Sequence, residues 1–113
     1  MQIPGAERAL VDPFKVLNYL LSFDHPVGRH KAVFFATLGY HRANWHEFAM
    51  QLQQHALRDS VALTEETPFG DKYVIARMTT GPNGHSAIIV TVWIVRHGET
   101  FPRLVTAYPG RTR

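Results

Sequence analysis

Two segments near opposite ends of the chain, Asp24–Phe35 and Pro102–Pro109, carry side chains that could bind and process a phosphate. Each combines apolar residues with imidazole, ammonium, guanidinium or hydroxyl groups, which can move protons or offset negative charge. A chain of 113 residues forms one core, so both segments must lie close to it and their polar groups could converge on one site. The candidate catalytic residues are His25, Lys31, Arg103, Thr106 and Tyr108.

His25 stands in a predicted turn and has two possible roles. Imidazole titrates near neutral pH, which suits a general acid or base. A turn histidine can instead bond a local backbone group. The nearby Lys31 favours the catalytic role, because active sites combine a proton-transfer group with cations that face a developing charge.

A predicted helix that starts near Gly28 gathers Arg29, His30 and Lys31 in its first turns. Free backbone N–H groups at a helix N-terminus already favour an anion, so a phosphate could bind there. Gly28 would let the phosphate approach closely. Arg29 and His30 could alternatively form a solvated face.

The C-terminal segment adds a guanidinium and two hydroxyls. Arg103 could grip phosphate oxygens bidentately, or it could pair with Glu99. Thr106 and Tyr108 could position a phosphate or a ribose hydroxyl, although β-propensity alone explains both residues. Tyr108 or Trp93 could stack a base, with a core position as the alternative for Trp93. The candidate substrate-binding residues are Gly28, Arg29, Tyr73, Thr91 and Trp93.

Composition limits the classes of site. Twelve Lys and Arg against nine Asp and Glu give a formal charge of +3, which is compatible with an RNA partner. The absence of cysteine excludes disulfides and thiolate metal sites. No histidine pair has the i, i+4 spacing that brings two imidazoles together on a helix, and no acidic cluster accompanies the seven histidines. The sequence therefore predicts neither a metal nor another cofactor.

Targeting signals are not apparent either. The first residues lack a basic segment followed by an apolar run, so no signal peptide is expected. No stretch approaches the ~18 consecutive apolar residues of a membrane helix. We therefore expect no membrane association and a cytoplasmic location.

The first half of the chain has helical periodicity. Asp12 can cap a helix with Pro13 at its first position. A second helix is predicted from about Val27 or Gly28 to Gly39, and a third from Asn44, capped with the help of Glu47, to about Arg58. The residues expected to face the core are Phe14, Leu17, Leu20, Leu21, Ala32, Val33, Phe35, Ala36, Leu38, Phe48, Leu52, His55 and Ala56.

The second half has the alternation and turn residues of strands. The first predicted strand contains Val61 and Leu63, which alternate with polar neighbours, and the others cover Lys72–Thr80, Ile88–Val95 and Arg103–Tyr108. The predicted turns lie at Pro68–Asp71, Gly81–Gly84 and His97–Glu99. Helices followed by consecutive short strands predict an α+β fold, in which three N-terminal helices pack on a four-stranded antiparallel meander sheet. We expect one domain over residues 1–113, with a core at 12–109 and a short basic tail, Arg111–Arg113.

Alternation divides the third predicted strand into two faces. Ile88, Val90, Val92 and Ile94 form the apolar set expected to meet the helices. Thr91 and Trp93 then lie on the opposite face. If Trp93 pairs with Thr106, that face also carries Thr106 and Tyr108.

The candidate segments also resemble a small bacterial domain family of uncharacterised function. The motifs that carry the resemblance are His25–Phe35, Leu38–Tyr40, Thr67–Tyr73, Gly81–Gly84, Thr91–Trp93 and Arg103–Pro109. They cover roughly residues 12–109 in the expected order. That family is similar to the barnase–EndoU–colicin–RelE group of ribonuclease toxins, which implies a metal-independent endoribonuclease.

On this hypothesis the 2′-hydroxyl of the RNA attacks the neighbouring phosphate and leaves a cyclic phosphate. His25 would do acid or base work, Lys31 and Arg103 would stabilise the phosphate, and Thr106 and Tyr108 would position it. The implied partners are an RNA substrate and a cognate acidic antitoxin or immunity protein. The alternative is a non-enzymatic module that docks a protein on its sheet.

Overall fold

The computed structural model describes residues 1–58 and 60–110, with helices in the first half of the chain and strands in the second. The elements are η1 (Ala6–Arg8), α1 (Pro13–Lys15), η2 (Val16–Leu20), α2 (Arg29–Thr37), η3 (Arg42–Asn44), α3 (Trp45–Arg58), β1 (Leu63–Thr67), β2 (Gly70–Thr80), β3 (Ser86–Arg96) and β4 (Arg103–Pro109). This order confirms the predicted α+β class. The predicted basic tail, Arg111–Arg113, lies outside the described residues.

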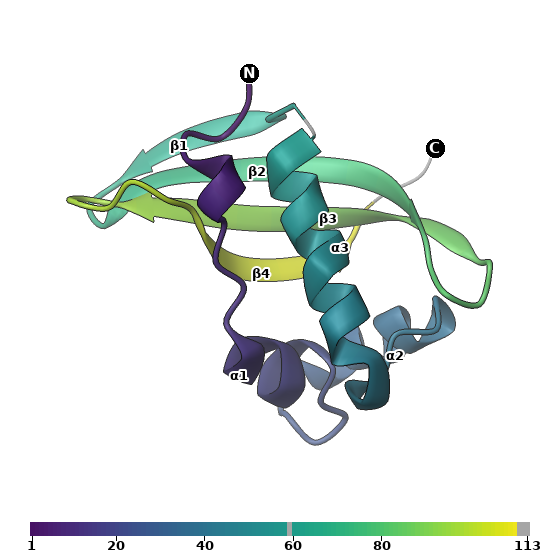
Figure 1. Cartoon of the computed structure of the whole chain (residues 1–113). Coiled ribbons are helices and arrows are strands. Elements are labelled where there is room, and N and C mark those ends of the chain that lie inside the picture. Colours follow the sequence, from purple (N-terminus) through teal and green to yellow (C-terminus); the bar gives the residue numbers. More distant parts are fainter. Residues whose placement is uncertain (59, 111–113) are drawn as a thin grey trace.

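The four strands form one antiparallel sheet in the order β1-β2-β3-β4, as the turn residues between them predict. In Figure 1, α3 crosses one face of this sheet, and α1 and α2 lie beyond the β4 edge. We call the face that meets α3 the inner face and the opposite one the outer face. Among the described residues, no helix is long and apolar enough to cross a bilayer.

The inner face of β3 is the face that was predicted to point away from the helices. Ile89, Thr91 and Trp93 of β3 are fully buried in the core. On the outer face, Val90 and Ile94 are each 9% exposed, and Ile88 and Val92 are only partly buried. Ile89 and Trp93 belong to the main core cluster and these four residues do not, so the predicted orientation of β3 is wrong. Both faces of this strand are largely apolar, so alternation alone does not choose between them. The indole N–H of Trp93 donates to Thr91 Oγ1 at 2.9 Å, which satisfies both polar groups inside the core.

A β-bulge sets the register of β4. Trp93 pairs with Leu104, whereas the preceding Val92 pairs with Thr106, so Val105 is an extra residue in β4. The pairing of Trp93 with Thr106, which was the condition for placing Thr106 and Tyr108 beside Trp93, is therefore not formed. Thr106 and Tyr108 belong to the outer-face side of the ladder, because a shift of one residue moves a side chain to the other face.

The first helical segment follows the predicted apolar stripe only in part, because Leu20 and Leu21 are buried as predicted and Phe14 is not. Asp12 caps it as predicted, since its carboxylate accepts from the Phe14 N–H at 2.9 Å. The segment then widens into the π-helical turn η2, closed by the Leu21 N–H and the Val16 carbonyl at 2.9 Å. This wider turn rotates the buried face, so Val16 enters the core while Phe14 is 71% exposed.

The other two helices follow the prediction more closely. In α2, Ala32 and Phe35 are buried, but Val33 points outward and is 56% exposed. All four predicted core residues of α3 are buried: Phe48, Leu52, His55 and Ala56.

The start of α3 differs from the predicted cap. Asn44 accepts from the His41 N–H at 2.7 Å and donates to the Gly39 carbonyl at 2.9 Å, so its side chain closes the turn η3 that precedes α3. The expected pairing of Asn44 with Glu47 across a capping box is not formed. The extra 3-10 turn places Asn44 before α3 rather than at its first turn.

Candidate functional site

A hollow of about 480 Å³ lies between η2, the start of α2 and the edge of β4. It brings together polar side chains from three separate parts of the chain. Three of the predicted catalytic residues, His25, Lys31 and Thr106, line it. We call it the tyrosine pocket, and its lining residues are Lys15, Tyr19, His25, Val27, Lys31, Val105 and Thr106.

Tyr19 is the centre of this pocket. The ammonium of Lys31 donates to Tyr19 Oη at 2.6 Å and lies 4.9 Å from the ring centroid. Thr106 Oγ1 lies 3.5 Å from the same phenolic oxygen. The Lys15 ammonium is 6.0 Å from the ring centroid. Two cations and a hydroxyl therefore surround one phenol.

These neighbours change the acidity of Tyr19. Burial by itself raises the pKa of the phenol, because the charged form is poorly solvated. The hydrogen bonds from Lys31 and Thr106, together with the charges of Lys31 and Lys15, stabilise the phenolate and outweigh burial. The net result is a pKa of Tyr19 below the ordinary value for tyrosine. The pocket thus favours a negatively charged oxygen.

His25 holds the turn that leads into α2. Its Nδ1 accepts hydrogen bonds from the backbone N–H of Val27 at 3.0 Å and of Gly28 at 2.9 Å. A ring nitrogen that accepts carries no proton, so neutral His25 has its proton on Nε2. The ring packs edge-on against Tyr19, with the centroids 5.0 Å apart. His25 thus bonds the local backbone and can offer an Nε2–H donor to the pocket.

Gly28 allows a close approach, but to the backbone of Tyr19. A Cβ atom at Gly28 would meet the Tyr19 carbonyl oxygen at 2.0 Å, so any other residue would push η2 away from the start of α2. The space that the sequence assigned to a phosphate is filled by this carbonyl. Glycine at this position therefore brings Tyr19 and Lys31 together.

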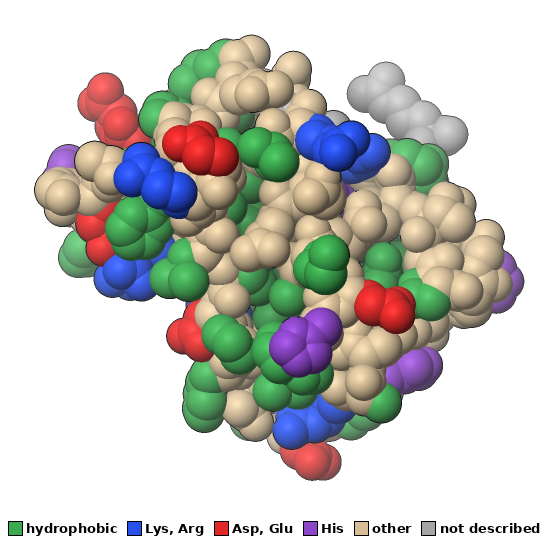
Figure 2. Space-filling model, in the orientation of Figure 1, with side chains coloured by type: hydrophobic (Ala, Val, Ile, Leu, Met, Phe, Trp, Pro, Cys, Tyr) green, Lys and Arg blue, Asp and Glu red, His purple; other side chains and the backbone are tan. Residues whose placement is uncertain are grey.

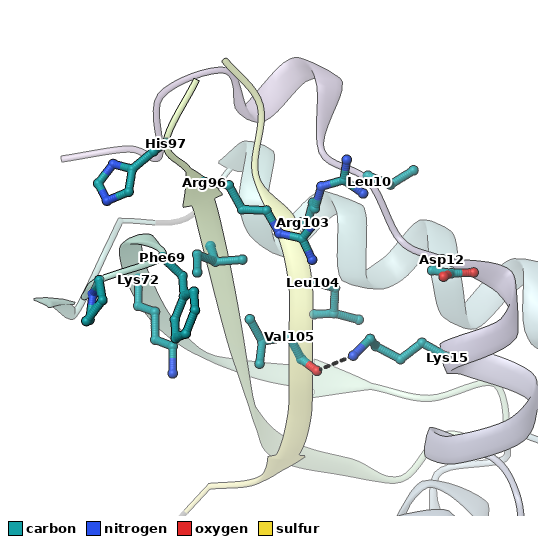
Figure 3. A pocket seen from close by; sticks show the side chains of 12 residues that line it. Leu10, Asp12, Lys15, Phe69, Lys72, Arg96, His97, Arg103, Leu104 and Val105 are labelled. Atoms are coloured by element: carbon teal, nitrogen blue, oxygen red, sulfur yellow. Dashed lines mark hydrogen bonds between the residues drawn. The ribbon is translucent and has the colours of Figure 1, made fainter. Parts of the chain in front are cut away.

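Lys15 ties α1 to the β-bulge. Its ammonium donates to the Val105 carbonyl oxygen at 2.9 Å (Figure 3). Val105 is the extra residue of β4, so the bulge and the lysine together fix the position of β4 relative to the pocket. Lys15 also lines a second hollow on the other side of this contact.

Arg103 lies in this second hollow, outside the tyrosine pocket. We call it the basic cleft; it has a volume of about 790 Å³. Its lining residues are Leu10, Asp12, Lys15, Pro68, Phe69, Lys72, Ile94, Arg96, His97, Arg103, Leu104 and Val105. Lys15 and Val105 line both hollows, so the two adjoin.

Arg103 pairs with Glu99, the alternative that the sequence left open. Its Nε and Nη2 donate to the carboxylate at 2.9 Å and 2.7 Å. The guanidinium carbon also lies 5.1 Å from the centroid of the Phe101 ring. The hydrogen bond from Arg103 is the main cause that holds the pKa of Glu99 below its usual range.

The remaining predicted residues do not line the tyrosine pocket. Tyr73, Thr91 and Trp93 are buried, and Tyr73 and Trp93 belong to the hydrophobic core cluster. Tyr108 lies farther along β4 on the outer-face side, and Arg29 is exposed at the first position of α2. The inverted orientation of β3 explains why its inner-face residues are unavailable.

Two pocket residues, Lys15 and Tyr19, were not among the predicted site residues. A signal for them exists, because residues four apart lie on the same side of a helix. Here Lys15 belongs to α1 and Tyr19 to the adjoining η2. Their convergence with Lys31 depends on how η2 packs against α2, which periodicity does not specify.

The pocket suits the handling of an anion with a transferable proton. Tyr19 can exchange a proton, and Lys15 and Lys31 can offset the charge of a phosphate. Across residues 1–58 and 60–110, no three His, Asp or Glu side chains gather closely enough to hold a metal ion.

One chain of a solved contact-dependent growth inhibition toxin–immunity protein complex from Klebsiella pneumoniae 342 has a similar fold, with a TM-score of 0.73 at 20% identity. The similarity covers 95% of this chain and 97% of that chain. No curated protein matches the sequence. Residues 2–111 match a domain family described as a domain of unknown function, DUF6883, and the chain therefore belongs to that family.

Proposed function

We propose that this domain is a metal-independent endoribonuclease toxin of a bacterial toxin–antitoxin or polymorphic toxin system. The observation that carries the proposal is the tyrosine pocket, where a phenol of lowered pKa stands between two lysines. The similarity in fold to a chain of a toxin–immunity protein complex supports the same class of system. A cognate acidic antitoxin or immunity protein would cover the basic site.

The geometry suggests a role for each pocket residue. The phenolate of Tyr19 accepts the proton of the RNA 2′-hydroxyl. Lys31 stabilises the phenolate before the reaction and the charged phosphate during it. Thr106 and the Nε2–H of His25 orient phosphate oxygens. Tyr19 therefore takes the proton-transfer role that was predicted for His25, because His25 Nδ1 already accepts hydrogen bonds from the turn.

The reaction balances without a cofactor. The 2′-oxygen forms a bond to phosphorus as its proton passes to Tyr19, and the bond from phosphorus to the 5′-oxygen breaks. The ammonium of Lys15 gives a proton to the departing 5′-oxygen. The products are a 2′,3′-cyclic phosphate and a 5′-hydroxyl. Proton exchange with water then restores Tyr19 and Lys15.

A second candidate is a non-enzymatic protein-binding module. The observation that favours it is the apolar character of the outer face, on which Leu63 and Met78 are 59% and 56% exposed. A partner protein could cover such a face. On this hypothesis His25 and Arg103 only stabilise their own turns.

The decisive experiment measures RNA cleavage by the purified chain in the presence of EDTA. Cleavage should continue, should yield cyclic phosphate ends, and should stop on RNA with a 2′-deoxy sugar at the scissile nucleotide. Tyr19→Phe should lower turnover about 10²-fold or more, the usual size for a proton-transfer group. Tyr108→Phe is the matched control and should retain turnover, because Tyr108 does not line the pocket. Equal turnover in the two variants, or activity that needs added metal, would contradict the mechanism.

A further inference from the structure

The basic cleft contains three cations, Lys72, Arg96 and Arg103, that the reaction in the tyrosine pocket does not use. Four of its lining residues are Lys or Arg, against one carboxylate, that of Asp12. The whole chain has 12 Lys and Arg and 9 Asp and Glu, so the cleft is richer in positive charge than the rest of the chain. On the side of α3, by contrast, Figure 2 shows the two signs interspersed.

The sheet register places these cations in order. Lys72 of β2 and Arg103 of β4 flank Ile94 of β3 in one cross-strand row on the outer face. Neighbouring strands are about 4.8 Å apart, so the two cations stand about 10 Å apart at their backbones. Arg96 extends the group two residues along β3. In Figure 3, Phe69 and Lys72 lie on one side of Val105 and Lys15 on the other.

One cation of the cleft is already held in place. Arg103 donates through Nε and Nη2 to Glu99, and within residues 1–58 and 60–110 its Nη1 makes no hydrogen bond. A guanidinium fixed at one edge can present its other edge to phosphate oxygens without losing further side-chain freedom. Asp12 also lies at the cleft, so the positive charge there is partly offset.

Phe69 supplies an aromatic surface beside the cations. It stands in the β1–β2 turn, where its N–H donates to Thr67 Oγ1 at 3.2 Å and its carbonyl accepts from the His97 N–H at 3.2 Å. The backbone is thereby held, yet the residue is 75% exposed. An exposed ring beside cations is the arrangement on which single-stranded nucleic acid stacks its bases.

We propose that the basic cleft binds the RNA strand next to the scissile phosphate, with Lys72, Arg96 and Arg103 on backbone phosphates and Phe69 against a base. This proposal rests on the proposed function, because the cleft adjoins the tyrosine pocket at Lys15 and Val105. A strand held in the cleft passes directly to Tyr19. An acidic protein segment would use the cations but not the ring, so RNA fits the full set of contacts better.

Binding and cleavage are measured separately to test this. The binding probe is a single-stranded RNA of 2′-deoxy sugars at the cleavable positions, followed by fluorescence anisotropy at several salt concentrations. Arg96→Gln and Lys72→Gln should each weaken RNA binding about threefold to tenfold. Each should also reduce the salt slope, which is the slope of the logarithm of the binding constant against the logarithm of the salt concentration, by about 0.7 per lost phosphate contact. Phe69→Leu should weaken binding by about fivefold or more while leaving the salt slope unchanged.

Arg58→Gln is the matched control, since it removes one exposed arginine from α3 on the opposite side of the sheet. If Arg58→Gln weakens RNA binding as much as Arg96→Gln does, the proposal is overturned. The absence of any RNA binding by the parent chain would overturn it too. A poly-glutamate peptide is the second probe. If the cleft variants weaken its binding but not that of RNA, the cleft docks a protein and the proposal is wrong.

The two proposals fail in different ways. RNA bound through the cleft without cleavage of the all-ribose strand would contradict the proposed function and retain the cleft. Cleavage of short and long RNA at rates unchanged by Arg96→Gln and Phe69→Leu would retain the function and reject the cleft.

Discussion

The sequence leaves two roles open for His25, bonding of the local backbone and proton transfer. Its Nδ1 accepts two backbone N–H groups ahead of α2, as a capping side chain does. We predict that His25→Ala lowers the free energy of unfolding by about 1–2 kcal/mol. His25→Asn should recover part of this loss, because its carboxamide oxygen can accept the same donors.

Chemical denaturation of both variants, alongside RNA turnover per folded molecule, checks this prediction. We expect the turnover of His25→Ala to fall less than that of Tyr19→Phe. If His25→Ala keeps its stability but has a turnover as low as that of Tyr19→Phe, the proton-transfer role belongs to His25.

Tyr19 offers a test that needs no substrate. Its pKa is lowered by Lys31, Thr106 and Lys15 against the opposing effect of burial, so its phenolate should form at a lower pH than that of a free tyrosine. Because the folded state favours the phenolate, this group adds stability above the ordinary tyrosine pKa of about 10. That contribution is lost as the pH falls through the lowered pKa.

We predict that Lys31→Met moves the titration of Tyr19 to higher pH, because it removes a hydrogen bond and a positive charge. Ring-resolved NMR titration is the measurement. Arg29→Met, which removes an exposed charge outside the pocket, should leave the Tyr19 titration nearly in place. If both variants shift Tyr19 equally, general charge rather than the contact with Lys31 sets its acidity.

At the scale of elements, the orientation of β3 decides which side chains form the core. Adjacent isoleucines on this strand provide a matched pair, because Ile89 is fully buried on the inner face and Ile88 is only partly buried on the outer face. We predict that Ile89→Ala lowers the free energy of unfolding by about 2–5 kcal/mol, and Ile88→Ala by about 1 kcal/mol or less.

Urea denaturation of the two variants measures the difference. A larger loss for Ile88→Ala would mean that the outer face is the more tightly packed one. That result would support the orientation predicted from alternation, in which Ile88 faces the core.

At the scale of the whole molecule, buried phenols limit stability in alkali. Burial is the main cause that raises the pKa of Tyr40 and of Tyr73, with smaller effects of Glu47 and Asp71 respectively. Ionisation is therefore harder in the folded state than in the unfolded one. Their contribution to stability is fully present below the ordinary pKa of about 10 and is lost as the pH rises above it.

We predict that the urea midpoint falls between about pH 8 and about pH 11, and falls less in the double variant Tyr40→Phe/Tyr73→Phe. The double variant is compared with the parent chain at both pH values, so any cost of the lost hydroxyls cancels. An equal fall in both proteins would assign the alkaline loss to other groups.

Several features of the whole fold depend only on residues that are neighbours in the chain. The cap at Asp12, the glycine that ends α2 and the turns between the strands are local, and these were predicted from the sequence. Gly39 has a φ of 94°, which explains why a glycine stands after α2. Such features depend on neighbours in the chain, so residue order is enough to predict them.

Periodicity in the sequence thus determined the α+β class, the strand order and the core stripe of α3, because each follows from short-range pattern. The chemistry of the side chains also selected His25, Lys31 and Thr106, which line one hollow in the structure. Only the tertiary structure decided the face of β3, the bulge at Val105 and the approach of Tyr19 to Lys31. Both faces of β3 are apolar, so the packing of the core rather than the alternation of residues decides which face lies inside. The approach of Tyr19 to Lys31 depends on contacts between segments that are separate in the chain, which a local pattern does not specify.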